Sequence, residues 1–193
     1  MLTLYHSPQS RSSRFLWLLE ELGQPYEVEY VTIRRGDGQG EADARNPHPQ
    51  GKVPAVMHDG RLVWESGAIA TYLADAFPEA GLAPRPGDPD RADYLAWMFF
   101  YASEVETNMM IKFLNVADER VSRMYDLMIE RFDGQLQKSP YIAGERFTAA
   151  DVLFGSAVEW GAGMLPKTPA FDAYLERLKA RPAYLRAQAR ETP

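Results

Sequence analysis

The stretch Gly51–Ser66, GKVPAVMHDGRLVWES, contains two short apolar runs separated by Asp59-Gly60. An Asp-Gly pair between two such runs is a strong signal for a tight β-hairpin turn. A helix is expected after the second run, because one face of the next segment is apolar and Pro78 ends the pattern. The residues on that face are Ile69, Tyr72, Leu73, Ala76 and Phe77. The stretch therefore predicts a ββα unit.

On the N-terminal side of this unit, the spacing of apolar residues is first that of a strand, then that of a helix, and then that of a strand again. Leu2 and Leu4 alternate as in a strand, and a second strand is expected around Val28–Tyr30, extending toward Ile33. Between them, four residues recur at helical spacing: Phe15, Leu18, Leu19 and Leu22. A glycine-rich loop and a short helix are expected to lead from there to the hairpin. The first half thus reads as an α/β domain of βαβ–ββα order.

On the C-terminal side the composition changes abruptly. The run PEAGLAPRPGDP, which begins at Pro78, contains four prolines and two glycines and cannot continue a helix. The expected division is a first domain at 1–78, a linker at 79–89 and an all-helical bundle domain at 90–193. Helical periodicity in that last part covers approximately 94–116, 121–136, 148–161, 171–179 and 184–190.

Composition narrows the function classes. The chain has 193 residues, 46% of them hydrophobic, and a formal net charge of −6 without any Lys/Arg-rich run. We therefore expect neither a nucleic-acid nor a membrane partner, and the absence of a leader pattern favours the cytoplasm. There is no cysteine, and the three histidines lack metal-ligand spacing, so no metal is expected. Any thiol chemistry must therefore use a thiol from a ligand.

Four features in this order resemble the cytosolic glutathione S-transferase superfamily over essentially the whole chain. They are GKVPAV before the hairpin, ES at Glu65-Ser66, the proline-rich linker, and ERFTAAD at 145–151. The segment SPQSRSSRFLWLLEELGQPYE at 7–27 is similar to bacterial and fungal-type members. The resemblance implies a thioredoxin-like domain followed by a helical bundle, a homodimer, and a cytoplasmic enzyme of detoxification. It also implies that glutathione is activated as a thiolate and conjugated to small apolar electrophiles.

The resemblance also implies a set of glutathione-binding residues. A cis bond before Pro54 exposes the backbone of Val53 for pairing with an extended ligand. Lys52 would contact the glycyl carboxylate, Glu65 the ammonium, and Ser66 with its helix N-terminus the γ-glutamyl carboxylate. Three alternatives stay open: a trans proline on an edge strand, a solvated surface lysine, and a serine that only caps its helix.

Four serines, at positions 7, 10, 12 and 13, lie where the superfamily keeps the group that stabilises the thiolate. A free thiol has a pKa of about 8.5, and a helix N-terminus with a donating hydroxyl lowers it. Counting from the strand end selects Ser10, whereas counting back from the helix shifts the match toward Gln9 or Arg11. Ser12 and Arg11 remain candidates beside Ser10, as do Ser7, Ser13 and the backbone amides. At least two of the serines are expected to be helix caps or loop residues.

Aromatic and methionine side chains suit an adaptable apolar site, and the candidates for the electrophile pocket are Tyr5, Phe99, Tyr101, Met109 and Trp160. Burial in the core is the alternative for each of them. Thr148 and Asp151 have the spacing of a capping box, which indicates a structural role for Asp151. Beside the transferase, two other functions remain: a glutathione-dependent disulfide reductase or peroxidase, and a non-catalytic glutathione-binding or interaction protein.

Overall fold

The computed structural model describes residues 1–193, which form two compact units. One unit comprises Met1–Ala80 together with Pro182–Pro193, and the other comprises Gly81–Arg181. The first boundary between the units lies between Ala80 and Gly81, inside the range 79–89 where a linker is expected. The assignment of 182–193 differs from the expectation, because the last helix belongs to the N-terminal unit and not to the helical one.

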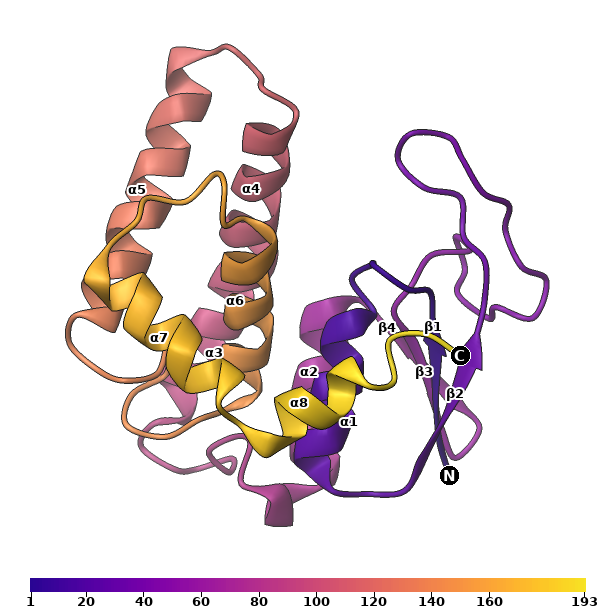
Figure 1. Cartoon of the computed structure of the whole chain (residues 1–193). Helices are drawn as coiled ribbons and strands as arrows, with labels where there is room; N and C mark the ends of the chain where they lie inside the picture. The colour runs from indigo at the N-terminus through magenta and orange to yellow at the C-terminus, as the bar shows by residue number, and fades with distance from the viewer. The chain divides into compact units, whose positions relative to one another are not determined.

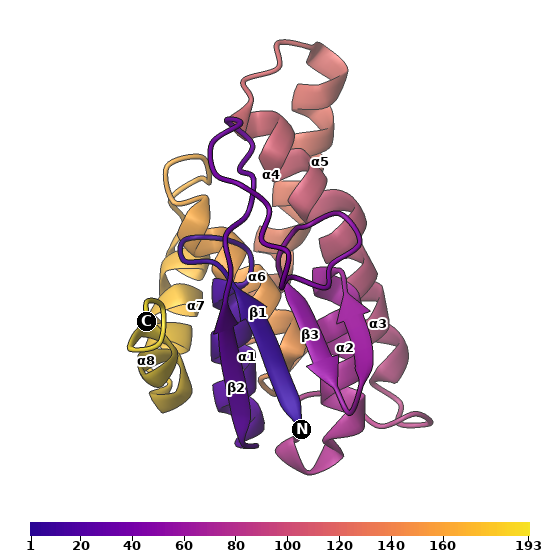
Figure 2. The ribbon, with the colours of Figure 1, turned by 90° about the vertical axis from the view of Figure 1, so that its right-hand side faces the viewer.

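The N-terminal unit is built on a four-stranded sheet of order β2-β1-β3-β4. The strands are β1 (Leu2–His6), β2 (Tyr26–Tyr30), β3 (Ala55–His58) and β4 (Arg61–Trp64). Strand β1 pairs parallel with β2 and antiparallel with β3, and β3 and β4 form the expected hairpin. Helices α1 (Ser13–Leu22) and α2 (Ser66–Ala76) lie on one face of this sheet, as Figure 2 shows. This arrangement is the thioredoxin-like fold, followed by a short 3₁₀ turn, η1 (Pro78–Ala80).

The short helix expected before the hairpin is absent, and residues 31–54 form loops and turns. Gly38 and Gly40 have φ angles of 83° and 77°, values that a helix cannot accommodate. Pro47 and Pro49 follow a few residues later and remove further helical hydrogen bonds. The glycines and prolines in this region therefore prevent the helix that its weak apolar periodicity suggested.

Helix α8 (Pro182–Gln188) packs against α1, and the two helices lie side by side in Figures 1 and 2. Trp17 meets Tyr184 edge to face, with ring centroids 5.2 Å apart. At the other end Arg186 donates to the carboxylate of Glu20 at 2.7 Å. Helix α1 thus packs against α8 as well as against β1 of the sheet and α2.

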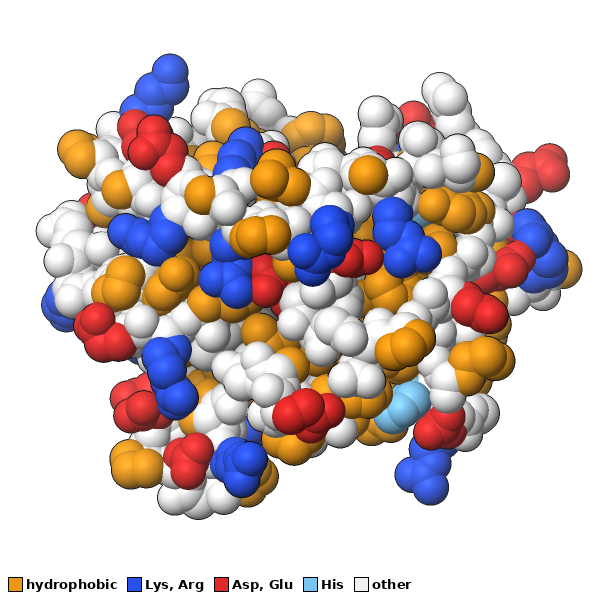
Figure 3. All heavy atoms as spheres, turned by 60° about the horizontal axis from the view of Figure 1, so that its bottom comes forward, with side chains coloured by type: hydrophobic (Ala, Val, Ile, Leu, Met, Phe, Trp, Pro, Cys, Tyr) orange, Lys and Arg blue, Asp and Glu red, His pale blue; other side chains and the backbone are white.

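The helical unit consists of α3 (Arg91–Phe100), α4 (Glu106–Phe113), α5 (Glu119–Leu136), α6 (Ala149–Trp160) and α7 (Pro169–Lys179). A π-helical turn, η2 (Tyr101–Val105), connects α3 to α4. The core of the helical unit is aromatic. The Phe132 ring lies edge to face with the rings of Phe154 and Phe171, at centroid distances of 4.8 and 4.9 Å. No helix is both long and apolar enough to cross a membrane. On the face seen in Figure 3, basic side chains lie among acidic ones.

The capping box at the start of α6 is confirmed. The Thr148 N–H donates to Oδ2 of Asp151 at 2.8 Å, and Asp151 is completely buried. Its other oxygen accepts from the Ile142 N–H at 2.8 Å and from the Tyr174 hydroxyl at 2.9 Å. Asp151 therefore connects the start of α6 to the preceding loop and to α7.

Candidate functional site

Three segments that carry candidate site residues meet at one end of the sheet. Tyr5 near the end of β1 pairs with Ala55 at the start of β3, and Ala55 pairs with Trp64 at the end of β4. The segments that follow β1, precede β3 and follow β4 are therefore neighbours. Helices α1 and α2 also begin at this end, so two helix N-termini with their partial positive charge lie there.

The segment before β3 carries Val53 and Pro54, and the peptide bond between them is cis. Both residues are buried, and the pairing of β3 with β1 starts only at Ala55. Val53 thus lies at the open end of the strand, where an extended peptide could add to the sheet edge. Lys52 is exposed beside it.

Two residues that the sequence reading did not select hold this loop in place. Asn46 donates its amide to the Lys52 carbonyl at 2.9 Å and accepts from the His48 N–H at 3.1 Å. The His48 ring lies edge to face with Trp64, and burial lowers its pKa, partly offset by nearby Glu65. The only signal in the sequence was the alternation of polar residues with prolines, Asn46-Pro47-His48-Pro49.

Glu65 and Ser66 join β4 to α2 in an unusual backbone conformation. Glu65 has φ 71° and ψ 128°, a positive φ that costs a non-glycine residue about 1–3 kcal/mol. Such outliers concentrate at functional sites. Glu65 takes the N-cap position, so the alternative that Ser66 is a cap does not hold. Ser66 is the first residue of α2 and is buried, whereas the Glu65 side chain is exposed.

The serine loop, Ser7–Ser13, connects β1 to α1 through a compact hydroxyl cluster. The Ser12 hydroxyl is fully buried and lies 2.8 Å from Nδ1 of His6, 2.7 Å from the Ser10 hydroxyl and 3.1 Å from the Ser7 N–H. Ser10 is only half-buried, and its hydroxyl also lies 2.6 Å from the Ser7 carbonyl. Ser12 takes the N-cap position of α1, but its side chain makes no capping hydrogen bond.

The partners of His6 determine which way the Ser12 hydroxyl donates. Nε2 of the buried His6 lies 3.0 Å from the carbonyl oxygen of Glu191, which can only accept, so Nε2 carries the proton. Burial lowers the pKa of His6, against the raising effect of Glu191, and favours the neutral ring. Nδ1 is then an acceptor, and the single proton of Ser12 goes to it.

Ser12 therefore has no proton left for a ligand, and its burial also keeps a ligand away. Ser10 differs from Ser12 in exposure and in its hydrogen bonds. It is partly exposed, and its hydroxyl can donate to the Ser7 carbonyl, to the Ser12 oxygen or to a ligand. Arg11 is exposed at the tip of the loop. Among the three catalytic candidates, the geometry favours Ser10 as a hydroxyl donor.

The five candidates for the electrophile pocket are not alike. Tyr101 and Met109 are 1% and 2% exposed and belong to the core of the helical unit, which corrects their placement in an open pocket. Phe99 and Trp160 are 73% and 51% exposed, and Trp160 packs against Phe113 with centroids 5.4 Å apart. Tyr5 is half-buried in the N-terminal unit.

The arrangement can hold an extended peptide with anionic groups and lower the pKa of a thiol. An open strand end suits its backbone, two helix N-termini favour anions, and an adaptable hydroxyl lies beside one of them. The structure contains no group of three or more His, Asp and Glu side chains arranged to hold a metal ion.

Comparison with known families agrees with this geometry. Residues 4–81 match the family model described as glutathione S-transferase, N-terminal domain, and residues 114–182 match glutathione S-transferase, C-terminal domain. Glutathione S-transferase 3 of Schizosaccharomyces pombe is 33% identical over 175 residues, which cover 78% of this chain and 70% of the relative.

Solved structures show the same similarity over nearly the full length. A glutathione S-transferase from Actinobacillus pleuropneumoniae has a TM-score of 0.86 at 28% identity, covering 99% of this chain and 93% of its own. A sphingomonad glutathione S-transferase in complex with glutathione has a TM-score of 0.82 at 28% identity, with 98% of both chains covered.

Proposed function

This chain belongs to the glutathione S-transferase family, and from that premise we propose that its sheet-edge site activates glutathione for conjugation to small apolar electrophiles. Glutathione is the co-substrate and supplies the thiol, because the chain itself has no cysteine. The enzyme is a transferase that uses side chains and backbone groups of the N-terminal unit to bind glutathione.

In this proposal the peptide arms and the sulfur of glutathione are held by different groups. Val53 pairs with the ligand backbone, Glu65 takes the ammonium, and Ser66 with the N-terminus of α2 takes the γ-glutamyl carboxylate. Lys52 lies beside the glycyl end. Ser10 donates its hydroxyl to the sulfur, and the N-terminus of α1 adds a positive dipole that favours the thiolate.

The observation that carries the proposal is the meeting of cis-Pro54, strained Glu65 and the serine loop at one sheet edge. Each feature alone has a structural explanation. Together they place a peptide-binding strand end, an anion site and a hydroxyl donor on neighbouring segments, which is what a charged thiol peptide requires.

Calorimetry with glutathione, followed by a conjugation assay with 1-chloro-2,4-dinitrobenzene, tests the proposal. We expect saturable binding at millimolar glutathione or below and glutathione-dependent product formation. A parallel assay of disulfide reduction separates the transferase from the reductase. The proposal is rejected if glutathione produces no heat, or if bound glutathione reduces disulfides without forming a conjugate.

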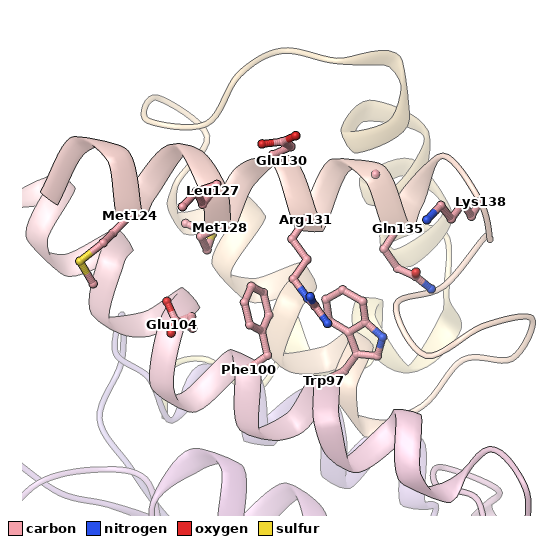
Figure 4. Close-up of a pocket in the computed structure, with 11 residues that line it drawn as sticks. Trp97, Phe100, Glu104, Met124, Leu127, Met128, Glu130, Arg131, Gln135 and Lys138 are labelled. Atoms are coloured by element: carbon pink, nitrogen blue, oxygen red, sulfur yellow. The ribbon is translucent and has the colours of Figure 1, made fainter. Parts of the chain in front are cut away.

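The proposal includes a two-fold homodimer in the cytoplasm, with a role in detoxification. Support for assembly comes from a groove of about 790 Å³ in the helical unit. Trp97, Phe100, Leu127 and Met128 contribute apolar surface to it, and Figure 4 shows Arg131 reaching toward the two aromatic rings. Charged and polar side chains line the rest of the groove, and exposed apolar surface rimmed by polar residues is typical of a protein-binding site. The cytoplasm is the compartment that keeps thiols reduced.

A further inference from the structure

We propose that Glu191 is a positioning residue for the serine loop, and through it for Ser10. The inference rests on the proposed function, since it assigns the residue that fixes the thiolate donor. Glu191 lies 178 residues from Ser13 in the sequence and yet contacts the serine loop directly.

The carboxylate of Glu191 bonds both ends of the loop tip with a single oxygen. Its Oε1 accepts from the Gln9 N–H at 2.6 Å and from the Ser13 hydroxyl at 2.8 Å. Gln9 has a φ of 54°, a left-handed conformation that is uncommon for residues other than glycine. The bond to its N–H helps to hold this turn, which immediately precedes Ser10.

The contact with Glu191 also fixes the direction in which the Ser13 hydroxyl donates. Because it donates to Glu191, its oxygen can accept from the Ser10 N–H, which lies 3.4 Å away. Glu191 thus holds two consecutive backbone N–H groups, that of Gln9 directly and that of Ser10 through the Ser13 hydroxyl.

The backbone of Glu191 acts on the cluster from a second direction. Its carbonyl accepts from Nε2 of His6, which leaves Nδ1 to accept from Ser12. The Ser12 proton is thereby withdrawn from Ser10, whose own proton can turn toward a ligand. Both the carboxylate and the carbonyl of Glu191 therefore set the geometry of the loop.

The segment that carries Glu191 is itself firmly anchored. The Tyr30 hydroxyl donates to the Arg190 carbonyl at 2.9 Å, and the Arg190 guanidinium lies over the Tyr26 ring at 4.2 Å. The side chain of Glu191 is only 25% exposed. Since β2 holds the segment in place, the carboxylate can impose its position on the serine loop.

The test compares Glu191→Ala, which removes the acceptor, with Glu191→Gln, which keeps an acceptor oxygen and loses the charge. Arg186→Gln is the matched control, because it breaks the contact of α8 with Glu20 without touching the loop. Two readouts are used: exchange of the Gln9 amide in the ligand-free protein, and titration of the bound glutathione thiol by its thiolate absorbance.

For Glu191→Ala we expect Gln9 amide exchange to rise about tenfold or more, since its hydrogen bond is lost. The pKa of bound glutathione should rise by about one unit and kcat should fall roughly tenfold, while KM for glutathione changes by less than about threefold. Glu191→Gln and Arg186→Gln should stay close to wild type in both readouts.

Three results would overturn the inference: a thiol titration that Glu191→Ala leaves unchanged, equal shifts in Glu191→Gln and Glu191→Ala, or an equal shift in Arg186→Gln. The second would assign the effect to charge and the third to general loosening of α8. Failure of the proposed function appears separately, as a wild-type protein that binds no glutathione, and Gln9 exchange still tests the contact in that case.

Discussion

The serine loop shows how burial sorts residues of the same type into different roles. Ser12 makes four polar contacts within 3.3 Å and has no exposed surface, whereas Ser10 has two inward acceptors and an open side. A hydroxyl that must donate to a thiolate needs a proton that can be redirected. Of the two residues, Ser10 has such a proton.

We predict that Ser10→Ala raises the pKa of bound glutathione by about one unit and lowers kcat and kcat/KM together by ten- to a thousandfold. Glutathione affinity should change little, because its peptide arms are held elsewhere. Thiolate absorbance against pH and steady-state kinetics measure these effects.

Ser12→Ala is the comparison variant for this prediction. It leaves the Ser7 N–H and Nδ1 of His6 without a partner, at a cost of about 1–3 kcal/mol in stability. Its melting temperature should fall, and its thiol titration should shift less than that of Ser10→Ala. A larger shift in Ser12→Ala would assign the donor to Ser12, and no shift in either would leave Arg11 or backbone amides.

Among single residues, the resemblance to the superfamily implied a cis bond before Pro54, which the structure confirms, and the sequence placed Glu65 and Ser66 at the start of α2. It could not choose among the serines, because the loop is held by Glu191, whose carboxylate bonds Gln9 and Ser13 across 182 and 178 residues of sequence. Asn46 and His48 were missed for a similar reason. Their role depends on a loop conformation that no periodicity encodes.

Among the elements, the start of α6 depends on one buried carboxyl group. Burial raises the pKa of Asp151 to about 6, although hydrogen bonds from Ile142, Thr148 and Tyr174 act in the opposite direction. Between the ordinary value of 3.8 and about 6, the folded protein keeps a proton that the unfolded chain has lost. The contribution of this group to stability therefore decreases as the pH rises through that range.

We predict that the free energy of unfolding of the wild type, measured relative to Asp151→Asn, falls by about 2 kcal/mol between pH 4 and pH 6. Asparagine does not titrate, so the difference isolates Asp151 from the other carboxyl groups. Urea unfolding at several pH values gives the two curves. A difference that stays constant or grows with pH would mean that the hydrogen bonds outweigh burial.

The sequence predicted the hairpin, the capping box and the main helices, because each has a strong local signal in turn residues or periodicity. The short helix expected before the hairpin was wrong, since glycines and prolines override a weak pattern there. The π-helical turn Tyr101–Val105 interrupts what periodicity alone shows as one continuous helix. A single extra residue in a turn leaves too small a trace in an apolar pattern.

For the whole molecule, the grouping of α8 with the N-terminal unit was not predictable from chain order. Helical periodicity shows that Pro182–Gln188 has an apolar face but not which surface covers it. The contacts of Tyr184 with Trp17 and of Arg186 with Glu20 decide the outcome. Because Glu191 follows directly, the same grouping brings its carboxylate to the serine loop.

The groove in the helical unit leads to a prediction about assembly. Leu127 on α5 lines it and is 47% exposed, although neighbouring Met128 is buried. A second copy that covers this surface would remove apolar side chains from water, at about 25 cal/mol per Å² of buried area. We predict that the wild type has twice the mass of one chain in light scattering at micromolar concentration.

Leu127→Glu should shift this equilibrium toward the monomer, because an unpaired carboxylate would then be buried in the interface. Leu185→Glu on α8 is the matched control, since Leu185 is 61% exposed and does not line the groove. It should remain a dimer, and circular dichroism should show that both variants are folded. A wild-type monomer would reject the homodimer, whereas a Leu127→Glu variant that still dimerises would place the interface on a different surface.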